Sequence, residues 1–209
     1  MEDVLSVYQR PYDPKRPQVC LDEIQKALRT TPRGQIAMQP GQPRREDHEY
    51  QRHGKCSLFL AVDPLRGYRH AWVRERRTKL DFAEVLRDLV DVIYPEVDVI
   101  VLVVDNLNIH HTACLYERFD PVEARRIVEK IEWHYTPVHG SWLNIAECEL
   151  SVLKRQCLKS RLPDIGTVIR KVSAWQKRRN QMESTIDWRF TTEDARIKLK
   201  RLYPIVKVQ

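Results

Sequence analysis

Three features of secreted and membrane proteins are absent from this sequence. Its five cysteines, an odd number, are scattered and form no Cys-x-x-Cys pair, which indicates reduced thiols and no disulfide framework. No apolar run approaches the length of about 20 residues that spans a bilayer. The start, Met1-Glu2-Asp3-Val4, lacks the basic and then apolar pattern of a secretory signal. We therefore expect a cytoplasmic protein with no membrane segment.

Internal repeats and low-complexity tracts are also absent, and the length of 209 residues suits one substantial domain. Lys and Arg outnumber Asp and Glu by 36 to 29, which gives a net charge of +7. A positive net charge favours polyanionic partners, and nucleic acid is the simplest of these. Charge alone is equally compatible with a merely soluble basic protein.

The clearest strand is the run of branched apolar residues at 99–104, which predicts a strand covered on both faces. Asp105 and Asn106 follow directly. In open α/β sheets ligands and chemistry collect at the carboxyl ends of central strands, so Asp105 lies at an expected active-site edge.

A second acid lies on a helix that we expect to begin near Ser141. Its apolar residues recur at steps of three and four and predict one buried stripe, made of Leu143, Ala146, Leu150, Leu153 and Cys157. Glu147 lies on this stripe, and a carboxylate that points at the core is costly unless it is paired or binds a metal. Asp105 is the obvious partner for it. Glu149 is about 200° further round the helix, so we expect it to face solvent or a neighbouring helix.

The other elements complete an α/β fold. After a short helix at 1–10 and an extended segment with three prolines, a brief strand at 19–21 ends in Asp22. We expect a long surface loop at 30–53, a hairpin of strands 56–62 and 68–74, and a strand at 131–135. Helices are predicted at 78–95, 120–129, 168–182 and 192–203. This order predicts an RNase H-like fold, a mixed five-stranded sheet flanked by helices.

On this scaffold Asp22, Asp105 and Glu147 could converge at one edge of the sheet. Taken alone, an acid after a strand such as Asp22 is more often a helix cap or turn residue, so the case for it depends on the other two acids. Together, a few carboxylates suit Mg²⁺ better than zinc. Two such ions can hold the attacking and leaving oxygens of a displacement at phosphorus.

Three motifs resemble those of a known family. They are Cys20-Leu21-Asp22-Glu23, the segment 103–110 (Val-Val-Asp-Asn-Leu-Asn-Ile-His) and the segment 134–147 (His-Tyr-Thr-Pro-Val-His-Gly-Ser-Trp-Leu-Asn-Ile-Ala-Glu). Here the chain is similar to the bacterial insertion-sequence transposases related to mariner elements, within the DDE endonuclease superfamily. The resemblance implies that Asp22, Asp105 and Glu147 are the metal-binding catalytic triad of a Mg²⁺-dependent enzyme that cleaves and joins DNA.

The resemblance also implies partners. They are double-stranded DNA, as transposon inverted repeats and target DNA, and a second copy of the chain in a homodimer. The resemblance further implies association with the nucleoid in the cytoplasm. Mn²⁺ is expected to substitute for Mg²⁺. Family members normally carry helix-turn-helix domains before the catalytic domain, and residues 1–18 are too short for one. We therefore expect a connector at 1–18 and an RNase H-like catalytic domain with C-terminal helices at 19–209.

Several further residues have two interpretations. Asn106 and Asn144 are expected to cap the turn and the helix beside the acids. His139, His110 and His111 are either metal ligands or proton relays, or ordinary turn and hydrogen-bonding residues. Trp142 is expected to pack in the core and not to stack on bases. Four arginines are either solvated surface residues or, together, a phosphate-binding track. They are Arg44, Arg45, Arg178 and Arg179.

Two competing functions predict different behaviour. A catalytically inactive DNA-binding remnant or regulator of a transposable element would bind DNA in a salt-sensitive way without turnover. A general RNase H-like nuclease would cut without preference for inverted repeats.

Overall fold

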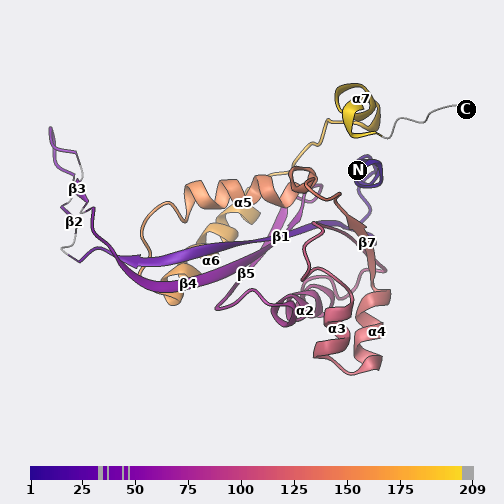
Figure 1. Cartoon of the computed structure of the whole chain (residues 1–209), viewed down its shortest axis with the longest axis horizontal. Coiled ribbons are helices and arrows are strands. Elements are labelled where there is room, and N and C mark those ends of the chain that lie inside the picture. The colour runs from indigo at the N-terminus through magenta and orange to yellow at the C-terminus, as the bar shows by residue number, and fades with distance from the viewer. Residues whose placement is uncertain (33–34, 37, 44, 47, 204–209) are drawn as a thin grey trace, which may run out of the picture.

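The computed structural model describes residues 1–32, 35–36, 38–43, 45–46 and 48–203 (Figure 1). A five-stranded sheet has the order β5-β4-β1-β6-β7. Its strands are β1 (Gln18–Thr30), β4 (Gln51–Asp63), β5 (Tyr68–Arg74), β6 (Ile100–Val104) and β7 (Ile131–Tyr135). β1, β6 and β7 are parallel, whereas β4 is antiparallel to both β1 and β5. The predicted mixed five-stranded sheet is confirmed.

Helices cover both faces of this sheet because its strands alternate between two apolar cores. Along β1, Val19 and Leu21 belong to one core, whereas Cys20 and Ile24 belong to the other. The first core is closed by α2 (Lys79–Asp88), which continues as a π-helical turn (Leu89–Ile93), and by α3 (Ala113–Arg118) and α4 (Pro121–Glu129). The second is closed by α1 (Glu2–Tyr8), α5 (Ile145–Gln156), α6 (Ile165–Gln181) and α7 (Thr192–Lys198).

The strands β1 and β4 are much longer than predicted. They pair from Cys20 and Val62 out to Thr30 and Gln51, and they project from the body of the domain as a twisted ribbon (Figure 1). Its tip holds the short strands β2 (Gln35–Ile36) and β3 (Arg45–Glu46). Residues 51–55 are exposed, so these positions show no apolar alternation in the sequence. Thr30 and residues 51–53 of the predicted loop at 30–53 therefore belong to β1 and β4, and the connection between the two strands begins after Thr30 and ends before Gln51.

Helix boundaries differ from prediction at α5, at the last helix and at α6 (Ile165–Gln181), which begins three residues before its predicted start. α5 begins at Ile145 and not near Ser141, because Ser141–Leu143 forms a separate 3-10 turn and Asn144 is the N-cap. α3 was not predicted. The last helix ends at Lys198, and the 3-10 turn Lys200–Leu202 follows. No helix in the described ranges is both long and apolar enough to cross a membrane.

The segment predicted as a connector, 1–18, packs against the domain. Val4, Leu5 and Val7 of α1 are completely buried. Tyr8 donates from its hydroxyl to the carbonyl of Leu143, at 2.7 Å. The start of the chain is thereby fixed to the turn that precedes α5.

Glu132 of β7 holds the other end of this segment. It accepts hydrogen bonds from Arg10 at 2.7 Å, from His134 at 2.9 Å and from Arg16. Burial acts to raise the pKa of Glu132, but the hydrogen bonds from Arg10, His134 and Arg16 outweigh it and lower the pKa to about 2. The ionised carboxylate therefore stabilises the fold.

Glu132→Gln should lower the free energy of unfolding by about 1–2 kcal/mol at pH 7, because charge-assisted hydrogen bonds are lost at a partly exposed site. The folded pKa lies below the unfolded one, so this stabilisation is complete above about pH 4.5. It disappears as the pH falls toward 2. Urea unfolding from pH 7 to pH 3 measures it.

The matched control is Glu129→Gln, which removes an exposed carboxylate paired with Arg125 one helical turn away. It should change stability by less than about 0.5 kcal/mol. Equal effects of the two substitutions would show that Glu132 does not fix the segment.

Candidate active site

Strand register places two acids side by side. In the parallel pair of β1 and β6, Cys20 lies opposite Val103. Continuing this register by two residues brings Asp22 beside Asp105, at the carboxyl end of β6. Side chains two residues apart point to the same face, and Cys20 and Val103 both belong to the core under α5. Asp22 therefore points to the α5 side of the sheet, whereas Asp105, which follows the end of β6, turns its Oδ1 toward His110.

Glu147 comes to the same place from the first turn of α5. The predicted stripe is confirmed at Leu143, Ala146, Leu150 and Leu153, which are completely buried, whereas Cys157 at its end is partly exposed. Glu147 itself is partly exposed at the edge of this stripe. The structure thus brings Asp105 and Glu147 close enough to Asp22 for their charges to act on it, so the three acids that the sequence singles out lie near the same sheet edge.

Asp22 is the most constrained of these acids. Its side chain is buried, its Oδ1 accepts from the backbone N–H of Glu23 at 2.7 Å, and its Oδ2 is buried without a hydrogen-bond partner. Burial raises the pKa of Asp22 to about 7, and the charges of Glu23, Glu147 and Asp105 add to the effect. A positive charge at this position would relieve both the repulsion and the unsatisfied oxygen.

Sequence analysis missed a buried network on the other side of Asp105. His110 is completely buried and donates from Nδ1 to Oδ1 of Asp105 at 2.5 Å and from Nε2 to Oε2 of Glu23 at 2.9 Å. Two carboxylate acceptors require both ring nitrogens to carry protons, which makes this ring an imidazolium. Arg77 donates to the second oxygen of Glu23 at 3.1 Å.

The charges in this network nearly cancel. Burial acts to lower the pKa of His110, but the hydrogen bonds and charges of Asp105 and Glu23 raise the pKa to about 9. Burial likewise acts to raise the pKa of Asp105, and the hydrogen bond from His110 outweighs it and lowers that pKa. The available signal was Glu23 itself, because an acid that follows Asp22 in a doubly covered strand points into the opposite core and needs a partner there.

The donor set fits a hard divalent cation. Carboxylate oxygens from β1, β6 and α5 are the ligands that Mg²⁺ and Mn²⁺ prefer, and Oδ2 of Asp22 has no other partner. Across the described residues, no three His, Cys, Asp or Glu side chains are grouped closely enough to hold one ion as they stand. The donors would therefore have to turn toward a common centre to bind one.

Glu149 faces a neighbouring helix, the second of the two predicted alternatives. It is buried between Arg69 of β5 and Arg179 of α6, whose Nε atoms lie 3.1 Å and 2.9 Å from its Oε1. Arg179 is thus paired with Glu149 inside the protein, and its phosphate-binding role stays a prediction. Arg69 also donates to the carbonyls of Gly67 and Ser184.

Of the two asparagines, Asn144 is a cap and Asn106 is not. The Oδ1 of Asn144 accepts from the N–H of Ala146 at 3.1 Å, and its Nδ2 donates to the carbonyl of Leu21 at 2.9 Å. It therefore joins the start of α5 to β1 beside Asp22. Asn106 is exposed, and the turn is capped by Asp105, which accepts from the N–H of Leu107 at 3.2 Å.

The turn before α5 exposes Trp142, which was predicted to be buried. Trp142 is 46% exposed, so the prediction of core packing is wrong, and its ring forms a T-shaped pair with that of Phe190. His139 is exposed with a positive φ of 64°. A Cβ on the next residue, Gly140, would lie 2.6 Å from the ring of Pro137, so only glycine fits here. His111 is exposed as well.

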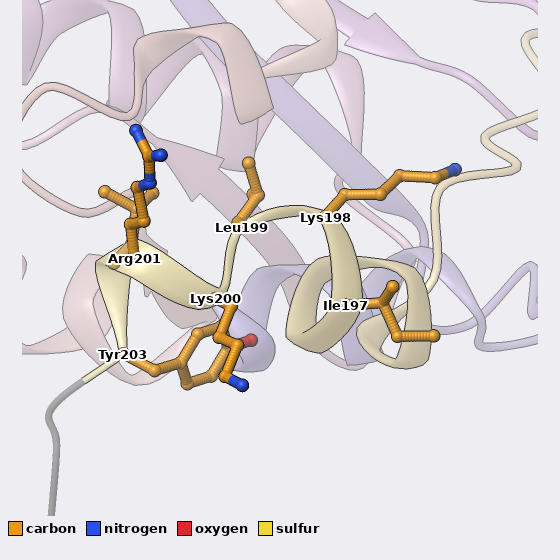
Figure 2. Close-up of a pocket in the computed structure, with 7 residues that line it drawn as sticks. Ile197, Lys198, Leu199, Lys200, Arg201 and Tyr203 are labelled. Atoms are coloured by element: carbon orange, nitrogen blue, oxygen red, sulfur yellow. The ribbon is translucent and has the colours of Figure 1, made fainter.

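Of the remaining predicted arginines, Arg178 is the one whose side chain the structure describes. Arg44 lies outside the described residues, and Arg45 is described only as part of β3. Arg178 is exposed on α6, where it lines a surface hollow with Lys171. A second hollow, lined by Ile197–Tyr203 on α7 and the turn after it, includes none of the three acids (Figure 2).

Comparison with known proteins gives one family and one shared fold. The family model of the DDE superfamily endonucleases matches residues 17–169, which contain Asp22, Asp105 and Glu147. A comparison with curated protein sequences gave no match. Among solved structures, the chain is similar to the Mos1 strand transfer complex, with a TM-score of 0.56 and 15% sequence identity.

That alignment covers 87% of this chain and 53% of the matched chain, so this chain spans about half the length of its structural relative. At this identity the likeness shows the fold, and it confirms the predicted RNase H-like arrangement. Because the family model spans well over half of the sequence, the chain belongs to the DDE superfamily endonucleases.

Proposed function

We propose that this chain is the catalytic domain of a DNA transposase in which Asp22, Asp105 and Glu147 bind divalent metal. The observation that supports the proposal is the approach of Asp105 and Glu147 to Asp22 near one sheet edge, with Oδ2 of Asp22 buried and unpaired. DDE superfamily endonucleases generally use divalent metal ions, which agrees with this donor set. Mg²⁺, replaceable by Mn²⁺, is the expected ion.

The residues around the acids hold them in position. His110 and Arg77 offset the charges of Glu23 and Asp105, which keeps Asp105 ionised. Asn144 fixes the start of α5, and therefore Glu147, against β1. When bound, two metal ions would stabilise the attacking and leaving oxygens of an in-line displacement at phosphorus. Water is the nucleophile in cleavage, and a 3′-hydroxyl is the nucleophile in joining.

The proposed partners are DNA and a second copy of the chain. A net charge of +7 favours a polyanion. The structural relative was solved as a strand transfer complex, which supports joining of DNA as the reaction here. We extend the proposal to terminal inverted repeats and target DNA as substrates, a homodimer as the active form, and an insertion-sequence origin with nucleoid association.

Incubation with duplex DNA that carries the inverted repeats of the parent element should give nicked and joined products with Mg²⁺ or Mn²⁺. Removal of metal with EDTA should stop both reactions. Denaturing gels resolve the products. Cleavage that persists in EDTA would rule out the proposed mechanism. DNA binding without any turnover would favour an inactive remnant, and cutting without repeat preference would favour a general nuclease.

Glu147→Gln and Glu149→Gln should separate a metal ligand from a structural ion pair. Glu147→Gln should weaken Mn²⁺ binding by at least about tenfold and abolish turnover, because a ligand is lost. Its stability should stay the same or rise, since repulsion among the acids is relieved. Isothermal titration with Mn²⁺ and urea unfolding provide the two readouts.

The matched variant Glu149→Gln should show the opposite pattern. Mn²⁺ affinity should be nearly unchanged. The free energy of unfolding should fall by about 3 kcal/mol, because two arginines lose a buried carboxylate. Equal losses of Mn²⁺ affinity in the two variants would contradict the assignment of Glu147.

A further inference from the structure

Three arginines surround one tyrosine on the β1–β4 ribbon. Arg29 of β1 pairs with Arg52 of β4 in the strand register, and Arg161 reaches the same place from the segment between α5 and α6. Their guanidinium carbons lie 4.4, 5.8 and 5.6 Å from the centre of the Tyr50 ring. We call Arg29, Arg52 and Arg161 the arginine cluster.

The arginine cluster is a concentration of positive charge. Within the part of the chain that the structure describes, none of its members forms an ion pair with a carboxylate, whereas Arg10, Arg69 and Arg126 all do. The Nε of Arg29 is buried without a hydrogen-bond partner. Like charges held this close repel one another, and an anion between them would remove the repulsion.

The cluster is held in place by neutral groups. Arg161 donates to Thr31 Oγ1 at 3.1 Å and to the carbonyl of Glu49 at 3.0 Å, which orients its guanidinium without neutralising it. Arg52 donates to the Tyr50 hydroxyl at 3.3 Å. That hydrogen bond and the charges of Arg52, Arg29 and Arg161 lower the pKa of Tyr50, as expected in a positive potential. The side chains are thus positioned before any ligand arrives.

A phosphodiester is the anion that suits this arrangement. Guanidinium groups present planar pairs of N–H donors that match phosphate oxygens. Asp22 and Arg29 lie seven residues apart on β1, which is about 23 Å along the strand. Base pairs in DNA rise by about 3.4 Å each, so this distance corresponds to about seven base pairs. A duplex that is cut at the acids can therefore reach the ribbon.

We propose that the arginine cluster binds a backbone phosphate of the DNA duplex, about seven base pairs from the phosphate that is cleaved. The inference rests on the proposed function for the identity of the polyanion. It assigns the ribbon a DNA-positioning role, distinct from the sheet edge where the acids lie.

The test measures binding of a fluorescent 30-base-pair duplex in EDTA, by anisotropy over a series of salt concentrations, so that no turnover is needed. Arg52→Gln and Arg161→Gln should each reduce the slope of log K against log salt by about 0.9 and weaken binding about eightfold at about 0.1 M salt. The double variant should lose no more than about 0.9 of slope in total, because the cluster contacts a single phosphate. Arg52→Lys and Arg161→Lys should restore the slope, since they keep the charge.

The matched control is Arg125→Gln, which removes one charge from the exposed face of α4 and should leave the slope unchanged. Three outcomes would overturn the proposal: wild-type protein that does not bind the duplex, glutamine variants with the wild-type slope, or lysine variants as weak as the glutamine variants. A change in dimerisation by sedimentation velocity, with an unchanged salt slope, would instead assign the cluster to contact between copies. Metal-dependent nicking is scored separately, so loss of the catalytic proposal leaves this result readable.

Discussion

The parallel pairing of β1 with β6 is the constraint on which the candidate site depends. Only the register pairs from Gln18 to Cys20 define it, yet they place Asp22 beside Asp105. A slip of one residue would turn Asp22 toward α2 and bury it among apolar side chains. Such a slip is opposed from both sides, because β1 is also held by β4 along almost its whole length and Asn144 binds the carbonyl of Leu21.

Neighbouring residues of β1 meet opposite electrostatic environments because they point to opposite faces. Glu23 is matched by His110 and Arg77, so its negative charge is locally compensated. Asp22 meets only other acids and a single backbone N–H, and its pKa rises to about 7. Two consecutive residues of the strand thus differ in charge compensation: the carboxylate of Glu23 is neutralised by its partners, whereas that of Asp22 is not. A site that attracts cations can exist here without the rest of the sheet edge being negatively charged.

Local patterns in the sequence were sufficient for the sheet and for the placement of the acids. The apolar run before Asp105, the stripe that carries Glu147, and the caps at Thr78 and Asp120 each depend on neighbours within a few positions. The errors concern contacts between distant segments. The ribbon is stabilised by cross-strand backbone pairing of polar residues, and Glu149 is buried by arginines that lie 80 and 30 positions away. Periodicity in one segment carries no information about such partners. It therefore could not predict the exposure of Trp142 or the burial of His110.

The ion pairs of Glu149 also decide which part of the site can adjust. Rotating or sliding α5 would break buried contacts to Arg69 and Arg179, at a cost of about 3–5 kcal/mol. Changing a side-chain torsion of Glu147, which is partly exposed, costs about 1 kcal/mol. If the carboxylate oxygens move closer together to bind an ion, they must therefore do so by rotation about side-chain bonds of the acids, while α5 keeps its position. The range of side-chain positions open to Glu147 would then determine which ion sizes fit, and backbone movement would contribute little.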